Sequence, residues 1–208
     1  MQHTLCNICY GRMIPIPPKA KLTKEEIIAT ALSITQREGI SALTARSLGA
    51  ALGTSSRPIF NDFKNMEEVR QETIKAARDV YHGYVLGKGP DHLAFTRIDY
   101  IRFAKEEPKL FELLFMTANN EENTFADILP AVFSNTDCLV SSVQVAYGLS
   151  WKSANRICQS MWFFIHGLAC LCVTGMAIYK ESEVITLVSE TFESILMKLK
   201  SLEGSRYE

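Results

Sequence analysis

The segment GTSSRPIFNDFK, residues 53–64, places an arginine and a lysine around a proline and two phenylalanines. Pro58 has no backbone N–H, and the first turn of a helix is where that donor is not needed. Proline also disfavours α geometry in the preceding residue, so Arg57 is expected at the start of a short helix, with Ser55 or Ser56 as its N-cap. A guanidinium at that position can pair with a phosphate or with the edge of a guanine.

The elements around this segment predict a helix-turn-helix. A helix of about two turns is expected to begin at Thr44 and to end at Gly53, and a second helix is expected over about 55–63. In a helix-turn-helix protein, the N-terminal end of the second helix enters the major groove of DNA. The alternative is that the small helices merely pack together and the charges only keep the surface soluble.

The two faces of the second helix follow from helical spacing. Ile59 and Phe63 are four residues apart, so both are expected to be buried on one face. The residues expected on the exposed side are Phe60, Asn61 and Lys64.

The charge of the chain is uneven, although its total is only -1. Residues 19–64 hold seven Lys or Arg and four Asp or Glu, a net charge of +3, and residues 65–208 carry -5. A basic head attached to an acidic body indicates that the head binds an anion.

Nearly the whole chain of 208 residues follows helical periodicity, which predicts an all-α fold. Thr23 and Glu26 have the spacing of a capping box at the start of a helix over 22–38. Further helices are expected from Asn65 to the break at 87–90, over 91–106, 108–118, within 124–148, and over 151–175 and 182–201. The special positions are Pro108 in a first turn, a bend at Pro130, and caps at Ser150 and Ser182.

Residues 22–69 resemble the DNA-binding domain of the TetR/AcrR family of bacterial regulators. The matching stretch is IIATALSITQREGISALTARSLGAALGTSSRPIFNDFKNMEEV, which has the family's threonine, arginine, leucine and glycine turn in order. The resemblance implies that operator DNA is contacted by Thr44, Arg46, Ser55, Phe60 and Lys64. The family often has Gly-Thr or Gly-Ser where this chain has Arg57 and Pro58, and tyrosine where it has Phe60. Phenylalanine cannot make the tyrosine's hydrogen bond to phosphate, and Arg57 is the candidate to replace it.

The element WFFIHG at 162–167 resembles the W-x-x-x-H-G element of one TetR C-terminal subclass, and EEPKLFELLFM at 106–116 is similar to that subclass too. Trp162 and His166 are four residues apart and therefore share a helix face. Two interpretations stay open, because His166 is either a hydrogen-bonded core residue or part of a pocket for a small-molecule effector. The other aromatic residues expected there are Tyr100, Phe103, Phe111 and Phe115, whose helical spacing also suits a core.

The pocket itself is expected between residues 95–116 and the helix that begins at Trp151.

Cys158, Cys170 and Cys172 lie in a strongly apolar stretch, a pattern typical of free cysteines in a reducing cytosol.

Neither metal chemistry nor catalysis is expected. Cys6 and Cys9 have the spacing of a zinc or redox motif, but no second pair accompanies them, so no metal or cofactor is predicted. The histidines are scattered and the serines lack a partnered base, so the chain is not expected to be an enzyme.

One stretch supports a different function. Residues 161–179 are almost entirely apolar and nearly long enough to cross a bilayer, so the alternative is a helical membrane-associated protein anchored there. A helix buried on all sides in a bundle or a dimer has the same composition. The preferred prediction is a cytoplasmic protein without membrane attachment.

Together these features predict a homodimeric transcriptional regulator, and more specifically a repressor. Its expected parts are a leader or disordered arm over 1–18, a helix-turn-helix DNA-binding head over 19–68, and an effector-binding and dimerisation domain over 69–208. Two heads would bind the half-sites of a pseudo-palindromic double-stranded DNA operator, and a small-molecule effector in the body would release them. The last two long helices are expected to form the dimer, because their apolar area is too large for a monomer surface.

Overall fold

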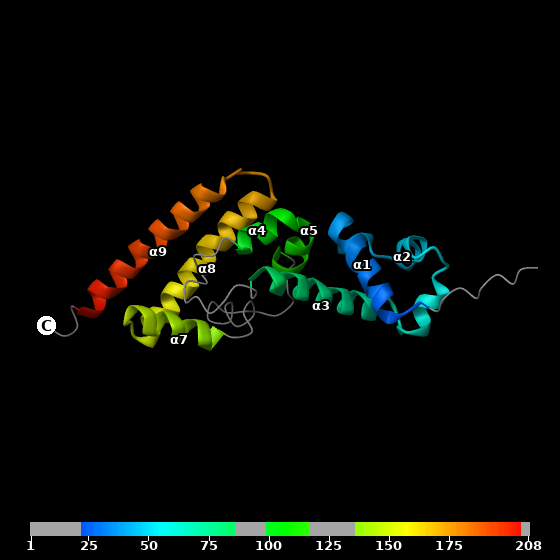
Figure 1. Ribbon diagram of the computed structural model, residues 1–208, viewed down its shortest axis with the longest axis horizontal. Helices are drawn as coiled ribbons and strands as arrows, with labels where there is room; N and C mark the ends of the chain where they lie inside the picture. Colours follow the sequence, from blue (N-terminus) through cyan, green and yellow to red (C-terminus); the bar gives the residue numbers. More distant parts are fainter. Residues whose placement is uncertain (1–21, 86–98, 117–135, 205–208) are drawn as a thin grey trace, which may run out of the picture.

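The computed structural model describes residues 22–85, 99–116 and 136–204, and the regular elements in these ranges are all helical (Figure 1). The predicted all-α fold class is confirmed. The N-terminal elements are α1 (Lys24–Glu38), η1 (Ile40–Ala42), α2 (Ala45–Ala51), η2 (Arg57–Asn61) and α3 (Met66–Val85). The C-terminal elements are α4 (Asp99–Glu106), α5 (Pro108–Phe111), η4 (Glu112–Met116), α7 (Thr136–Tyr147), α8 (Trp151–Val173) and α9 (Glu181–Gly204).

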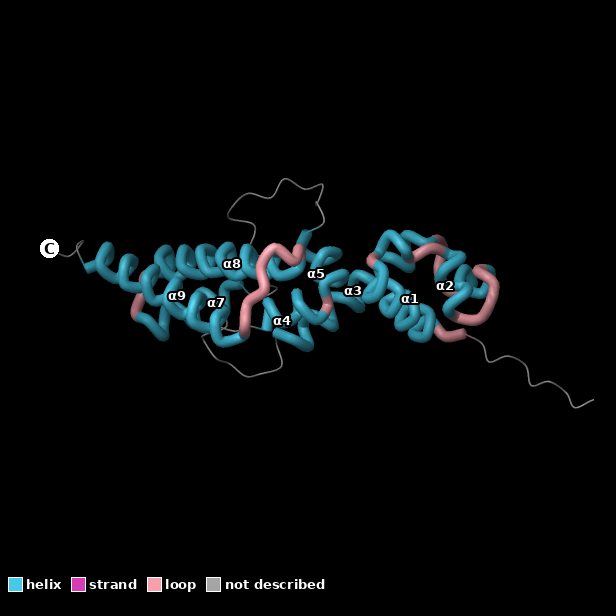
Figure 2. Tube along the Cα trace, turned by 90° about the horizontal axis from the view of Figure 1, so that it is seen from above, coloured by secondary structure: helices cyan, strands magenta, loops and turns pink. Residues whose placement is uncertain are grey.

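Helix α3 joins two hydrophobic cores. The smaller core lies among α1, α2, η2 and the start of α3, where Val69 is fully buried. The larger core begins two turns further along α3, at Ala77, and continues through α4, α5, α7, α8 and α9. We call the part around the smaller core the head and the part around the larger core the body. Figure 2 shows the head and the body at opposite ends of an elongated molecule, with α3 running between them.

The first helix of the head begins and ends where local chemistry predicts. The Thr23 hydroxyl accepts a hydrogen bond from the Glu26 backbone N–H at 3.2 Å, and the Glu26 carboxylate accepts one from the Thr23 N–H at 2.9 Å. This is a complete capping box, which satisfies two donors that the first turn leaves without a helical partner. Gly39 ends the helix with a φ of 86°, a conformation that favours glycine.

The turn between the two short helices of the head is tight. Helix α2 is capped by Thr44, as predicted, and Gly53 follows it with a φ of 64°. A Cβ atom added to Gly49 would lie 3.1 Å from the backbone N of Ser56 and 3.1 Å from the carbonyl O of Thr54. The small size of Gly49 therefore allows the turn to fold back onto α2.

The second of these helices differs from the prediction in two respects. It is a 3-10 helix, Arg57–Asn61, and it is shorter than the predicted 55–63. Ser56 precedes it but makes no capping hydrogen bond through its side chain, because its backbone is already in the αR region, whereas an N-cap residue is extended. The predicted position of Pro58 in the first turn is confirmed.

The helices of the body that contact the head also differ in part from the helices predicted from the sequence. Of the helix predicted over 91–106, the structure describes α4, and Pro108 lies in the first turn of α5 as predicted. The prediction of one α-helix over 108–118 is wrong, because a π-helical turn, η4, follows Phe111. Within this arrangement Phe111 and Phe115 both contact the Tyr100 ring, at centroid distances of 5.4 and 5.2 Å, so tertiary packing accompanies the irregular turn.

The C-terminal helices match the prediction more closely. The Ser150 hydroxyl caps α8 by accepting a hydrogen bond from the Ser153 N–H at 3.3 Å. Ser182 is not the cap of α9, because that helix begins at Glu181, and the Glu183 carboxylate accepts the hydrogen bond from the Lys180 N–H at 2.7 Å. Helix α7 is the described part of the helix predicted within 124–148, and the bend predicted at Pro130 lies outside the described residues.

Helix α8 is the one helix in the described ranges that is long and apolar enough to cross a membrane, judged by length and composition only. The central helix of a helical bundle passes the same test. In this structure α8 packs against α4, α7 and α9, and 33% of its most apolar stretch is buried (Figure 1).

Candidate functional site

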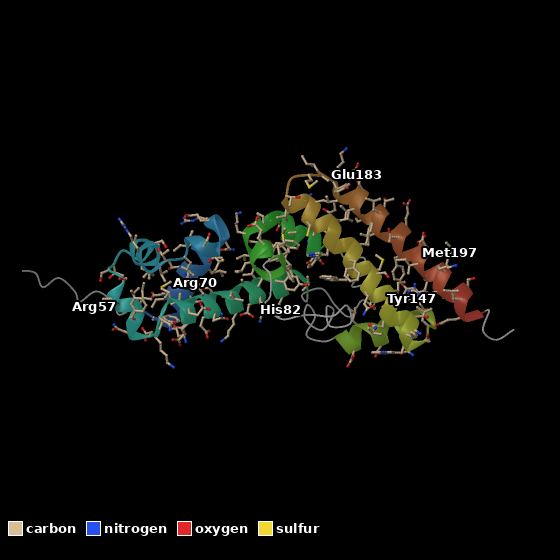
Figure 3. All side chains as sticks on the ribbon, turned by 180° about the vertical axis from the view of Figure 1, so that it is seen from behind. Arg57, Arg70, His82, Tyr147, Glu183 and Met197 are labelled. Carbon is tan, nitrogen blue, oxygen red and sulfur yellow. The ribbon has the colours of Figure 1, made fainter. Side chains whose placement is uncertain are left out.

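The head exposes three cations around the turn between α2 and η2. Arg46 lies on α2, Arg57 begins η2 and Lys64 follows it, and all three side chains are exposed. None of them forms an ion pair with any described residue, in contrast to Arg70, whose guanidinium lies 3.7 Å from the Glu67 carboxylate. Figure 3 shows Arg57 at the end of the head that lies farthest from α9.

The two faces of η2 separate as the sequence predicts. Ile59 is 0% exposed and Phe63 is 2% exposed, so both belong to the small core. Phe60 is 42% exposed, and Asn61 is exposed beside it. An exposed phenylalanine next to unpaired cations suits contact with a surface that is both apolar and anionic.

The hydroxyl residues assigned to DNA contact differ in what they already bind. The Thr44 side chain accepts a hydrogen bond from the Ser47 N–H at 3.1 Å, and the Ser47 hydroxyl accepts one from the Thr44 N–H at 2.9 Å. Thr44 therefore holds α2 in place, and its hydroxyl oxygen also lies 3.0 Å from the Ser47 hydroxyl oxygen, so the side chain is already engaged within the cap. Ser55 is exposed and Ser56 is half-buried in the turn.

The six residues predicted around an effector lie together in the body. His166 is at the centre, because its Nδ1 atom lies 2.9 Å from the Tyr100 hydroxyl oxygen and its ring stacks on two others. The Trp162 ring is parallel to it within 11° at 4.8 Å between centroids, and the Phe111 ring is within 26° at 5.8 Å. Phe115 completes the group through contacts with Tyr100 and Phe111, and Phe103 packs beside both phenylalanines. We call this group, with Tyr81, the aromatic cluster.

The aromatic cluster keeps its ionisable groups neutral. Burial lowers the pKa of His166, because a charged imidazolium loses its hydration there. Burial raises the pKa of Tyr100 and of Tyr81, so both phenols stay protonated. The cluster is therefore an uncharged, apolar environment that contains hydrogen-bonding groups.

Two buried donors in the aromatic cluster have no hydrogen-bond partner among the described residues: the Tyr81 hydroxyl and the Trp162 indole N–H. Tyr81 is 4% exposed. The centroid of its ring lies 6.1 Å from that of Tyr100 and 5.0 Å from that of Phe115. Buried polar groups almost always have a hydrogen-bond partner, so two buried donors without one call for an explanation. The sequence analysis assigned Tyr81 to no site, although its position one turn after Ala77 on α3 indicates an inward-facing residue.

A pocket is predicted between residues 95–116 and α8. In the structure, rings of the aromatic cluster, such as Tyr100 on α4 and His166 on α8, pack against each other in this region. A groove of about 490 Å³ lies elsewhere, along the outer face of α7. The described residues that line it are Cys138, Ser141, Ser142, Val145 and Ala146, none of which the sequence analysis assigned to a site.

Head and body are connected next to the aromatic cluster. The Gln36 side chain, on α1, donates hydrogen bonds to the Glu107 carboxylate at 3.1 Å. Glu107 comes directly before α5, the helix that carries Phe111. The Tyr84 hydroxyl donates to the Glu106 carboxylate at 2.7 Å, and burial together with this bond raises the pKa of Tyr84 to about 12. Because Gln36 on α1 binds Glu107 directly before α5, a displacement of α5 would also displace α1.

Within the described ranges, no three His, Cys, Asp or Glu side chains come together in a group that could hold a metal ion. Cys6 and Cys9 lie outside those ranges.

Two known proteins similar to this chain are named as uncharacterized HTH-type transcriptional regulators. No protein-family model matches the chain. The chain is 26% identical over 165 residues to the HTH-type transcriptional regulator Rv0681 of Mycobacterium tuberculosis, an alignment that covers 76% of this chain and 73% of that protein. It is 20% identical over 188 residues to the HTH-type transcriptional regulator YobS of Bacillus subtilis, over 88% of this chain and 95% of that protein. The names of these distant relatives support a DNA-binding transcriptional regulator and weigh against an enzyme.

Proposed function

We propose that this chain is a cytoplasmic transcriptional repressor of the TetR/AcrR type, which binds a pseudo-palindromic operator as a homodimer and is released by a small-molecule effector. The observation that carries this proposal is the outer surface of the head. Arg46, Arg57 and Lys64 are exposed there and form no ion pair with a described residue, while the opposite face of η2 is buried. Exposed cations without protein partners are what phosphate contacts require.

The proposed contacts follow from the positions of these side chains. Arg57, at the start of η2, is the candidate to enter the major groove and pair with a guanine or a phosphate. Arg46, Lys64, Thr44 and Ser55 are the candidates for contacts to the DNA backbone. Phe60 and Asn61 complete the surface, where Phe60 can contact a thymine methyl group but cannot replace a tyrosine's hydrogen bond.

The proposed dimer uses α8 and α9. Helix α9 exposes large apolar side chains, with Ile185 at 46%, Met197 at 68% and Leu202 at 43% exposure. Their spacing of 12 and 5 residues places these three side chains on different sides of α9, so they form no single apolar stripe. The proposed dimer is supported mainly by the half-buried apolar side chains along α8, such as Phe164 and Leu171. A pair of heads would then bind two half-sites of one operator.

The proposed effector site is the aromatic cluster, formed by Tyr100, Phe103, Phe111, Phe115, Trp162 and His166 together with Tyr81. The unpartnered donors on Tyr81 and Trp162 support it, because a ligand with hydrogen-bond acceptors would satisfy them. The contact between Gln36 and Glu107 supports a route from this cluster to the head. Effector binding would shift α5, and with it the two heads, so that operator and effector affinities are linked.

The DNA-binding part is tested with duplexes selected from a random library by the full-length protein. We expect Arg46→Ala and Lys64→Ala each to weaken binding and to lower the slope of log affinity against log salt by about one per half-site, because each loses one phosphate contact. Arg37→Ala is the matched control: Arg37 is 65% exposed and lies 3.4 Å from Glu38, at the end of α1 away from the turn. Unchanged affinity and slope in both test variants would refute the proposed interface.

A further inference from the structure

The four cysteines in the described ranges have different surroundings. Cys138 is exposed on α7, and Cys158 is fully buried on α8, where burial raises the pKa of its thiol to about 12. Cys170 and Cys172 are both half-buried near the end of α8. Of these four, Cys170 is the one whose sulfur lies within hydrogen-bond distance of an imidazole, since its Sγ atom is 3.4 Å from Nε2 of His166.

The imidazole beside Cys170 is held in a fixed orientation. Its other nitrogen, Nδ1, lies 2.9 Å from the Tyr100 hydroxyl, and its ring lies between the Trp162 and Phe111 rings. A nucleophile, an adjacent base and a third group that orients the base form the arrangement by which proteins activate thiols and hydroxyls. The spacing of four residues along α8 and the contact from α4 together produce this arrangement.

The thiol and the imidazole are both neutral at rest, and burial makes proton transfer between them less favourable than in water. Burial lowers the pKa of His166, so the imidazole is neutral near pH 7 and can accept a proton. Burial raises the pKa of Cys170, so little thiolate exists before a reagent arrives, and the proton must leave as the sulfur attacks. Cys172 lies two residues further along the same helix and shows no such partner among the described residues.

We propose that Cys170 captures soft carbon electrophiles of the α,β-unsaturated carbonyl class, with His166 as the base that takes its proton. In this step the Cys170 sulfur forms a bond to the β-carbon, and the electron pair of the C=C bond moves toward the carbonyl. The thiol proton passes to Nε2 of His166 and then to the α-carbon, so the addition needs no oxidant or reductant.

The aromatic cluster offers more than the thiol for this class of compound. The Trp162 indole N–H and the Tyr81 hydroxyl lack partners among the described residues, and Trp162 is eight residues before Cys170, about 12 Å along α8, so only an electrophile that spans this distance would place an acceptor on the indole N–H. Such an electrophile would thereby occupy the proposed effector site. The idea that it acts as an effector rests on the proposed function, whereas its addition to Cys170 does not.

The addition is tested on the full-length protein with N-ethylmaleimide at limiting concentration. The tryptic peptide 157–180 contains Cys158, Cys170 and Cys172, so tandem mass spectrometry compares the three thiols within one molecule. A positioned base accelerates proton transfer by at least about 10²-fold, and we expect Cys170 to react faster than Cys172 by a factor approaching that value. Equal rates for Cys170 and Cys172 would overturn the proposal.

The role of His166 is tested by substitution. We expect His166→Gln, which keeps hydrogen-bonding capacity but has no basic nitrogen, to lower the Cys170 rate to that of Cys172. Tyr100→Phe, which removes only the orienting hydroxyl, is expected to lower it partly, and it keeps the test available if His166→Gln does not fold. An undiminished Cys170 rate in folded His166→Gln would show that the imidazole is not the base, and an undiminished rate in folded Tyr100→Phe would show that the Tyr100 hydroxyl does not orient it.

The effector role is tested separately by DNA binding. We expect one equivalent of N-ethylmaleimide on Cys170 to weaken binding of the selected duplex at least tenfold, and Cys170→Ser protein treated in the same way to keep its affinity. Failure of the untreated protein to bind any duplex would refute the proposed function alone. Binding that survives complete modification of Cys170 would refute the electrophile as effector.

Discussion

The head and the body treat polar groups in opposite ways. In the head, Thr23 and Thr44 cap helices at the surface, and Arg57 points its charge into solvent. The buried Thr35 hydroxyl is satisfied by donating to the Ala31 carbonyl of its own helix. In the body, polar groups of the aromatic cluster are enclosed by rings, and two of them have no partner among the described residues. The difference indicates that the head is built to present a charged surface and the body to hold a neutral interior.

The two regions also differ in how their helices are specified. The capping boxes of α1 and α2 join residues three apart in the chain, so each helix start is determined locally. The contact between Tyr100 and His166 joins residues 66 apart, and its geometry depends on how α4 packs on α8. Substitutions should therefore act on the surface of the head without unfolding it, whereas in the body stability and site geometry change together.

The largest effect is expected from Phe111→Ala. Phe111 is fully buried and contacts four other rings of the aromatic cluster, so its loss leaves a cavity in the larger core. We expect the free energy of unfolding to fall by about 3–5 kcal/mol, measured by urea denaturation. Val145→Ala, at a side chain that is 84% exposed on α7, is the control and should change stability by less than about 0.5 kcal/mol. A Phe111→Ala loss as small as that of the control would contradict the close packing of this cluster.

A smaller effect on stability separates the two faces of η2. Ile59→Ala removes a side chain with 0% exposure and should cost about 2–5 kcal/mol in the free energy of unfolding, with the amide protons of the head exchanging faster. Phe60→Ala removes the neighbouring side chain, which is 42% exposed, and should leave the thermal midpoint nearly unchanged while it weakens binding to the selected duplex. If Phe60→Ala destabilised the head as much as Ile59→Ala does, the outer face of η2 would be structural and the proposed interface would lose its support.

Most of the head could be predicted from the sequence because its signals are local. Helix α1, its capping box, the glycine turn and the burial of Ile59 all follow from spacing within a few residues. The 3-10 form of η2 and the absence of a side-chain cap at Ser56 could not be predicted, because they depend on the turn folding back onto Gly49. That close approach is a tertiary property.

The body was less predictable for the same reason. Helix α8 and its cap at Ser150 follow from local pattern, but the π-helical turn of η4 accompanies the packing of Phe115 against Tyr100. The neighbours Trp162 and His166 were visible as a pair four residues apart. The part played by Tyr81 was not, because nothing in the sequence connects α3 with α4 and α8 at that point.

The smallest effect concerns pH, where head and body should again differ. Burial lowers the pKa of His166, so the unfolded chain binds a proton there more readily than the folded protein does. Acid therefore favours unfolding: the contribution of the neutral imidazole is complete above the ordinary histidine pKa of about 6.5 and is lost as the pH falls through the lowered pKa. Accordingly, the stability advantage of the wild-type protein over His166→Gln should be greatest near neutral pH and should shrink as the pH is lowered toward 5.

Urea denaturation across this pH range measures the stability advantage, with His82→Gln on α3 as a control substitution of the same kind outside α8. An advantage that stays constant with pH would mean that His166 is as easily protonated in the folded body as in the unfolded chain, and the uncharged interior inferred for the aromatic cluster would have to be abandoned.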